Sequence, residues 1–153
     1  MMPVPGGPLA IEPRRGTIYP DPFKKGCEDR LQRALTGPLG LPKFGCPCDN
    51  ARAGRARQNA TRAGEDQCVY VLSGEVVLVT DEAERFLNAG MAAHVPAGVP
   101  NGRHLINRGT APVTYHELGT RSPDDVATYP DIDLHLVRTK FTTTLSHKNG
   151  DPH

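Results

Sequence analysis

The chain has 153 residues, the size of one domain, and its 18 Lys and Arg nearly balance 17 Asp and Glu. Gly (16) and Pro (15) are abundant and aromatic residues make up only 5%, which argues against a helical bundle and favours a turn-rich β domain. The formal net charge of +1 gives no field for nucleic acid or acidic membranes, and no apolar run is long enough to cross a bilayer. We therefore expect no nucleic-acid or membrane partner and, without a signal-peptide core at the N-terminus, a cytoplasmic protein.

The N-terminal part is rich in proline and shows no sustained periodicity, so we expect an extended arm over residues 1–43 that packs on a core. Within this arm, residues 29–35 have an acidic start and apolar residues at helical spacing before Gly37 and Pro38. This pattern predicts a short helix.

From Gln67 onward the chain consists of short β-rich segments separated by turn residues. Residues 67–72 and 75–80 flank Ser73 and Gly74, which predicts a β-hairpin. Further strands are expected over 85–87, 91–95, 103–107 and 113–118. Regular short strands are typical of a sandwich or small barrel, so the predicted fold class is all-β, with a core over about 44–121. Residues 122–153 are interpreted as a polar C-terminal tail.

Four cysteines, Cys27, Cys46, Cys48 and Cys68, are too few for a disulfide-dense secreted scaffold, so we expect reduced thiols. The spacing of Cys46 and Cys48 puts both thiols on one face of a strand, where they could donate to zinc. No second Cys or His pair stands at zinc-finger spacing. Ordinary buried or surface thiols are the simplest interpretation, with a metal, redox or nucleophilic role as the alternatives.

Two blocks of the chain match the pattern of a known family. The block 90–98, followed by Asn107, resembles the second conserved motif of the cupin superfamily, and the hairpin 67–74 resembles the end of its first motif. The resemblance is to small single-domain bacterial cupins. It implies a cupin-type β-barrel, a double-sheet jelly roll around a central pocket, usually as a homodimer. Gly74 and Gly98 stand where the turns need a positive φ.

The metal ligands of the cupin motifs are missing. The resemblance places the first two histidines at 60 and 62 or at 61 and 63, and none of these positions is a histidine: the chain has Ala60, Thr61, Arg62 and Ala63. The acid falls on Gln67 and the third histidine on Arg103 or, counted strictly from Pro96, on Asn101, with His104 one residue off register from Arg103. An amide is a poor ligand for a divalent cation, and a protonated arginine would repel one. The sequence therefore predicts degenerate metal-binding motifs, with no metal and no other cofactor at the usual cupin site.

Strand parity predicts what occupies the pocket instead. If the ligand position points inward, as the resemblance implies, Gln67 and Arg103 both project into the cavity. An inward arginine needs a carboxylate, a phosphate or a substrate anion, so we expect a small anionic or carbonyl-bearing ligand. The candidate substrate-binding residues are Arg103, Arg62, Gln67 and Tyr115. The alternative is that both arginines lie in solvent at the mouth of the barrel.

Three histidines, His94, His104 and His116, are candidates for acid–base catalysis. An imidazole titrates near neutral pH, and a pocket without a metal must take its catalysis from side chains. His116 alternates with Tyr115 and Glu117, so only one of these two sets can line the pocket. Each histidine is equally compatible with an ordinary core or surface position.

Three functions remain compatible with the sequence. The first is a metal-independent enzyme of small-molecule metabolism that catalyses isomerisation, cyclisation or dehydration by moving protons in the barrel. The second is a non-catalytic ligand-binding or regulatory cupin that has lost its metal and its chemistry together. The third is a cupin with a relocated metal site built from the three histidines and a cysteine.

Overall fold

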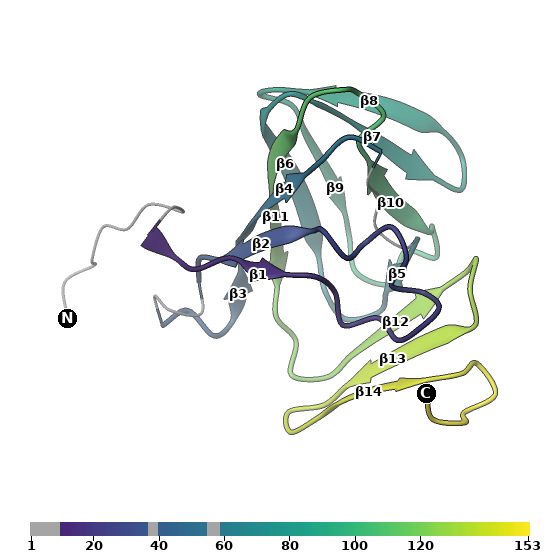
Figure 1. Ribbon diagram of the computed structural model, residues 1–153. Coiled ribbons are helices and arrows are strands. Elements are labelled where there is room, and N and C mark those ends of the chain that lie inside the picture. The colour runs from purple at the N-terminus through teal and green to yellow at the C-terminus, as the bar shows by residue number, and fades with distance from the viewer. Residues whose placement is uncertain (1–9, 37–39, 55–58) are drawn as a thin grey trace.

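A computed structural model describes residues 10–36, 40–54 and 59–153 (Figure 1). The first nine residues of the expected N-terminal arm lie outside the described residues. Antiparallel strands arranged in three sheets make up the described part, which contains no α-helix and so no helix able to cross a membrane. The predicted all-β class is confirmed.

The largest sheet has seven strands in the order β1-β2-β4-β11-β6-β9, with β3 also paired to β11. Its strands are β1 (Arg14–Arg15), β2 (Leu31–Ala34), β3 (Phe44–Gly45), β4 (Pro47–Ala51), β6 (Gln67–Ser73), β9 (Ala92–Val95) and β11 (Val113–Thr120). The predicted short helix over 29–35 is wrong, because Leu31–Ala34 forms β2. Backbone pairing with β4 outweighs the weak helical preference of this short segment.

A three-stranded sheet in the order β10-β7-β8 packs on the large sheet. It consists of β7 (Glu75–Thr80), β8 (Glu84–Asn88) and β10 (Arg103–Ile106). The core between the two sheets contains Val71, Val76, Leu78, Leu87, Leu105, Val113 and Tyr115. Both strands of the predicted 67–80 hairpin form, but the hairpin itself is wrong, because β6 and β7 belong to different sheets and do not pair with each other. Gly74 (φ 81°) and Gly98 (φ 75°) adopt the positive φ that their turns require.

The C-terminal region forms a four-stranded sheet in the order β14-β13-β12-β5, at the lower end of the molecule in Figure 1. Its strands are β5 (Thr61–Arg62), β12 (Asp125–Tyr129), β13 (Leu134–Arg138) and β14 (Thr143–Ser146). Interpreting residues 122–153 as a polar tail is therefore wrong. Alternate residues of β12 and β13 bury a second core of Ala127, Tyr129, Leu134 and Leu136, against which Tyr19 and Phe23 of the arm pack.

Strand register divides the side chains of the large sheet between two faces. Tyr115 and Val71 point into the core, and residues directly opposite them on neighbouring strands share that inner face. One inner row contains Arg14, Gln32, Asp49, Tyr115 and Val71; a second contains Glu117, Val69 and Ala93; a third contains Gly45, Gly119, Gln67 and Val95. The outer face holds Arg33, Cys48, His116, Tyr70, Cys68 and His94.

Candidate functional site

A small cavity of about 60 Å³ lies between the large sheet and the three-stranded sheet. Its wall is largely apolar, with Val69, Leu78, Val95 and Leu105 among its residues. The polar residues of the wall are Tyr19, Arg62, Gln67, Arg103, His104, Glu117 and Tyr129. Charged and hydrogen-bonding groups therefore converge on a confined, mostly apolar space.

Arg103 and Gln67 meet in this cavity. β6 starts at Gln67, and β10 starts at Arg103 on the facing sheet. The Arg103 guanidinium donates from Nη2 to Gln67 Oε1 at 2.6 Å. An amide oxygen thus receives the guanidinium at the position where the cupin motif would place an acid.

Glu117 supplies a carboxylate to the same cavity. It stands on the inner face of β11, and Arg30, from the N-terminal arm, donates to its Oε2 at 3.0 Å. The same guanidinium donates from Nε to Asp49 Oδ1 at 2.7 Å. Burial disfavours the charged form of Arg30, but the attraction of Asp49 outweighs this, so the pKa of Arg30 is raised. Arg30 therefore remains charged and fixes the orientation of Glu117.

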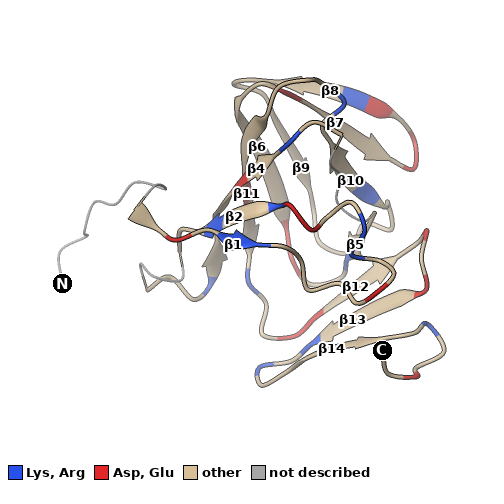
Figure 2. Ribbon diagram, in the orientation of Figure 1, with Lys and Arg blue, Asp and Glu red and all other residues tan. Residues whose placement is uncertain are grey.

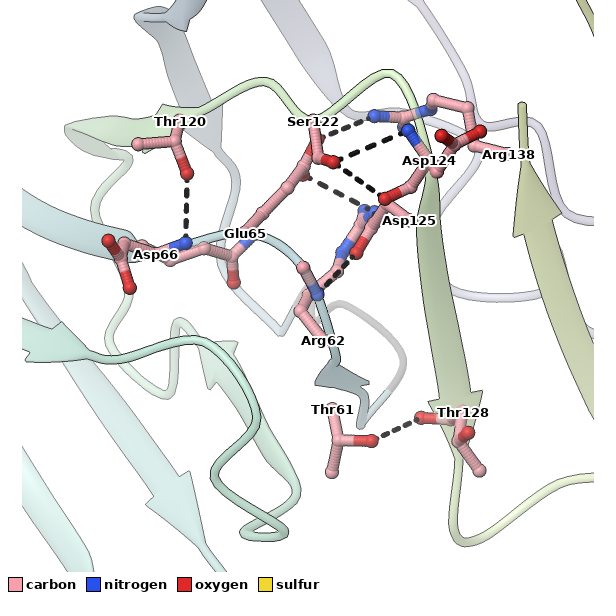
Figure 3. A network of polar contacts seen from close by, with 12 residues as sticks. Thr61, Arg62, Glu65, Asp66, Thr120, Ser122, Asp124, Asp125, Thr128 and Arg138 are labelled. Atoms are coloured by element: carbon pink, nitrogen blue, oxygen red, sulfur yellow. Dashed lines mark hydrogen bonds and ion pairs between the residues drawn. The ribbon is translucent and has the colours of Figure 1, made fainter. Parts of the chain in front are cut away.

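Arg62 reaches the cavity wall from a network of ion pairs that joins β5 to β12 and β13 (Figure 3). It pairs with the fully buried Asp125, which also accepts the backbone N–H of Gly64 at 3.1 Å. Glu65 lies 3.5 Å from Arg62 and 2.8 Å from Arg138. Asp125 on β12 and Glu65, in the loop after β5, thus fix the position of the Arg62 guanidinium.

A larger pocket of about 540 Å³ adjoins the cavity. Both have Tyr19, Arg62, Gln67, Glu117 and Tyr129 in their walls. The outer pocket adds several arginines from the arm and the sheet ends, namely Arg14, Arg30, Arg121 and Arg138. A ligand could therefore extend from the confined cavity into this wider, more polar space.

The candidate histidines are not gathered in the cavity. His94 is exposed on the outer face of β9. His116 also lies on the outer face, where its Nδ1 is 3.3 Å from the Pro47 carbonyl oxygen and 3.8 Å from Cys46 Sγ. Tyr115 is buried in the core and, among the described residues, belongs to neither pocket wall.

His104 belongs to the cavity wall, although strand alternation directs its side chain away from that of Arg103. Its Nδ1 is buried and has no hydrogen-bond partner among the described residues. Burial lowers the pKa of His104 below its usual value of 6.5. The imidazole is therefore neutral at neutral pH.

The thiols of Cys46 and Cys48 are poor candidates for a reactive centre. All four cysteines are free, and burial raises the pKa of both Cys46 and Cys48. A raised thiol pKa disfavours the thiolate that nucleophilic attack and metal binding require.

The residues at the usual cupin metal site do not fit a divalent cation. The Arg103 guanidinium lies on Gln67 Oε1 there, and a fixed positive charge at that point opposes cation binding. Within 10–36, 40–54 and 59–153, no group of three or more His, Cys, Asp or Glu side chains is arranged to hold a metal ion.

Sequence reasoning did not single out Arg30, Asp49 or Glu117 as residues of the site. Glu117 could have been found, because it shares strand parity with the buried Tyr115. Arg30 lies 87 positions before Glu117 in the chain, and Asp49 precedes an ordinary strand residue, Asn50. No sequence spacing links these three residues.

Comparison with known proteins places the chain in a family. The family model for the cupin domain matches residues 53–119. A crystal structure described as a sugar phosphate isomerase of the cupin superfamily, from Silicibacter pomeroyi, is 32% identical with a TM-score of 0.90, over 95% of this chain and 93% of that chain.

More distant structures share the fold alone. A protein from Acidithiobacillus ferrooxidans, provisionally named a sugar phosphate isomerase, is 22% identical with a TM-score of 0.76, over 89% of this chain and 86% of that one. A predicted oxalate decarboxylase from Thermotoga maritima is 15% identical with a TM-score of 0.62, over 76% and 97% of the two chains. No protein of curated function matches the chain. From the motif match and the similarity over nearly its full length, the chain belongs to the cupin superfamily.

Proposed function

We propose that this cupin is an isomerase that binds a small phosphorylated sugar and moves a proton next to its carbonyl group without a resident metal. The proposal rests on one observation: the Arg103–Gln67 contact and the Glu117 carboxylate lie in the wall of the same confined cavity. The similar protein from Silicibacter pomeroyi is described as a sugar phosphate isomerase, which supports the choice of substrate class.

The proposed chemistry divides the work between two groups. Arg103 donates hydrogen bonds to the carbonyl oxygen of the substrate and stabilises the negative charge that develops there, as an oxyanion hole does. The Glu117 carboxylate removes the proton from the neighbouring carbon, which gives an enediolate, and returns it to the former carbonyl carbon. The hydroxyl proton of the neighbouring carbon moves to the former carbonyl oxygen, so atoms and electrons balance within the substrate and no redox partner is needed. Arg30 and Asp49 act as positioning residues for Glu117.

Solvent hydrogen exchange tests the reaction. Aldose and ketose phosphates of three to six carbons are incubated with the protein in D₂O, and ¹H NMR follows loss of the proton next to the carbonyl group. We expect exchange and isomerisation with at least one of these compounds, unchanged after dialysis against a chelator. Exchange that disappears on chelation and returns with a divalent metal would overturn the metal-independent mechanism, and elemental analysis would then identify the metal.

Arg103 variants test the anion-binding role separately. Arg103→Lys keeps the charge but loses the planar fork, and Arg103→Met loses both. Ligand affinity should fall in the order wild type, Lys, Met, with a full loss of about 2 to 4 kcal/mol for a desolvated pair. Equal affinities in all three proteins would show that Arg103 does not contact the ligand.

A non-catalytic ligand-binding cupin is the second candidate. The placement of His94 and His116 on the outer face favours it, because the cavity then has few groups that titrate near neutral pH. Saturable binding of a sugar phosphate with no hydrogen exchange at any pH between 5 and 9 would support this candidate over the isomerase.

A further inference from the structure

The two adjoining pockets differ in size and in charge. By volume, the inner cavity of about 60 Å³ holds on the order of five water-sized groups, whereas the outer pocket has about 540 Å³. Only the reacting end of a sugar phosphate fits in the inner cavity. If the proposed function is correct, the phosphoryl group must therefore lie in the outer pocket.

The arginines of the outer pocket fall into two groups. Arg30, Arg62 and Arg138 are paired with carboxylates. Arg14 and Arg121 are exposed residues whose side chains have no ion-pair or hydrogen-bond partner among the described residues. Arg14 lies on β1, which is blue in Figure 2, and Arg121 directly follows β11. Only this second pair has its charge available to a ligand.

Backbone geometry holds Arg121 in the pocket wall. Its N–H donates to the Lys43 carbonyl oxygen at 3.0 Å, which extends the pairing of β11 with β3. The Arg121 side chain then lies over Gly45, where a Cβ would be only 3.2 Å from Arg121 Nε. Because Gly45 has no side chain, there is room for the Arg121 guanidinium beside this strand.

We propose that Arg121 and Arg14 form a phosphoryl-binding subsite at the outer pocket, distinct from the carbonyl-binding cavity at Arg103. This inference rests on the proposed function for its substrate class. Arginine suits the role because its planar fork donates two hydrogen bonds to a phosphate. Glu12, the acid of this wall that forms no ion pair among the described residues, opposes anion binding and tunes its strength.

Inorganic phosphate tests the subsite without knowledge of the substrate. Phosphate affinity is measured by isothermal titration calorimetry at constant ionic strength, for wild type, Arg121→Gln, Arg14→Gln and Glu12→Gln. We expect saturable binding to wild type, at least a fivefold weakening in each arginine variant, and tighter binding in Glu12→Gln. Arg85→Gln is the matched control, because it removes the same charge from exposed β8, outside both pockets.

The outcomes separate this proposal from the isomerase. Phosphate binding that depends on Arg121 but not on Arg85 supports the subsite even if no hydrogen exchange is found. Binding that Arg121→Gln leaves unchanged, or that Arg85→Gln weakens equally, overturns the subsite even if the protein proves to be an isomerase. No binding of phosphate to the wild type also overturns it. Circular dichroism confirms that each variant is folded.

Discussion

The two faces of β11 carry different chemistry within one strand. Tyr115, Glu117 and Gly119 face inward, where the carboxylate is paired with Arg30 and the glycine leaves room beside Gln67. His116 and Leu118 face outward, next to Cys48 and Cys68 on the neighbouring strands. His116, a catalytic candidate from the sequence, therefore lies on the face away from the cavity, whereas the adjacent Glu117 lies on the face toward it.

This difference has a physical cause. A carboxylate inside the barrel needs a paired cation and hydrogen bonds, whereas the half-buried His116 has contacts with Pro47 and Cys46 on the outer face. The inner face meets this requirement with Arg30 from the arm, which pairs with both Asp49 and Glu117. The carboxylates of the inner face are therefore those that Arg30 pairs.

The largest expected effect comes from removing a buried inner carboxylate. Asp49→Ala leaves the Arg30 guanidinium without its principal acceptor in a buried position, so it should lower the free energy of unfolding by about 3 to 5 kcal/mol. Asn50→Ala, one residue along on the outer face, loses only a hydrogen bond to Thr114 and should cost about 1 kcal/mol. Urea denaturation measures both. Equal losses would show that the two faces are energetically alike.

Activity should divide between the faces in the same way. Glu117→Gln keeps the shape of the side chain but removes the proposed base, so it should lower the rate of hydrogen exchange by about 10²-fold or more. His116→Gln changes the adjacent residue on the other face. It should leave this rate within about twofold of wild type, because the His116 side chain points away from the cavity. If His116→Gln loses the activity and Glu117→Gln keeps it, the proposed catalytic face is wrong.

Much of the fold between Gln67 and Thr120 could be predicted, because its strands alternate regularly and its turns carry glycine. The resemblance, combined with strand parity, predicted that Gln67 and Arg103 point inward, and both belong to the cavity wall, although their roles in binding stay predictions. The C-terminal sheet could not be predicted, because its buried Asp125 resembles a surface acid until Arg62 is placed against it. Such pairs join residues distant in sequence, and local patterns do not encode them.

The inner row that contains Gly45 and Gly119 offers a test with a smaller expected effect. A Cβ at Gly119 would lie 2.8 Å from the Asp66 carbonyl oxygen, so Gly119→Ala must shift backbone beside Gln67. We expect a loss of about 1 to 3 kcal/mol in stability. At Gly109 the nearest atom to a Cβ is a side-chain oxygen of Asn107 at 3.3 Å, so Gly109→Ala is the milder control. Thermal melts compare the two variants, and a greater loss in Gly109→Ala would contradict this view of the inner face.

The smallest expected effect concerns His104, which stands between the inward Arg103 and Leu105 on β10. Burial lowers its folded-state pKa below 6.5, so the unfolded chain binds a proton at a pH where the folded chain does not. Its contribution to stability is therefore fully present above about pH 6.5 and is lost as the pH falls through the folded-state pKa. His104→Gln should flatten the decline of unfolding free energy between pH 7 and pH 5, as urea titrations at each pH would show. His94→Gln removes an exposed imidazole from the outer face and should keep the wild-type slope. A slope that changes in His94→Gln but not in His104→Gln would assign the acid sensitivity to the outer face and contradict the burial of His104.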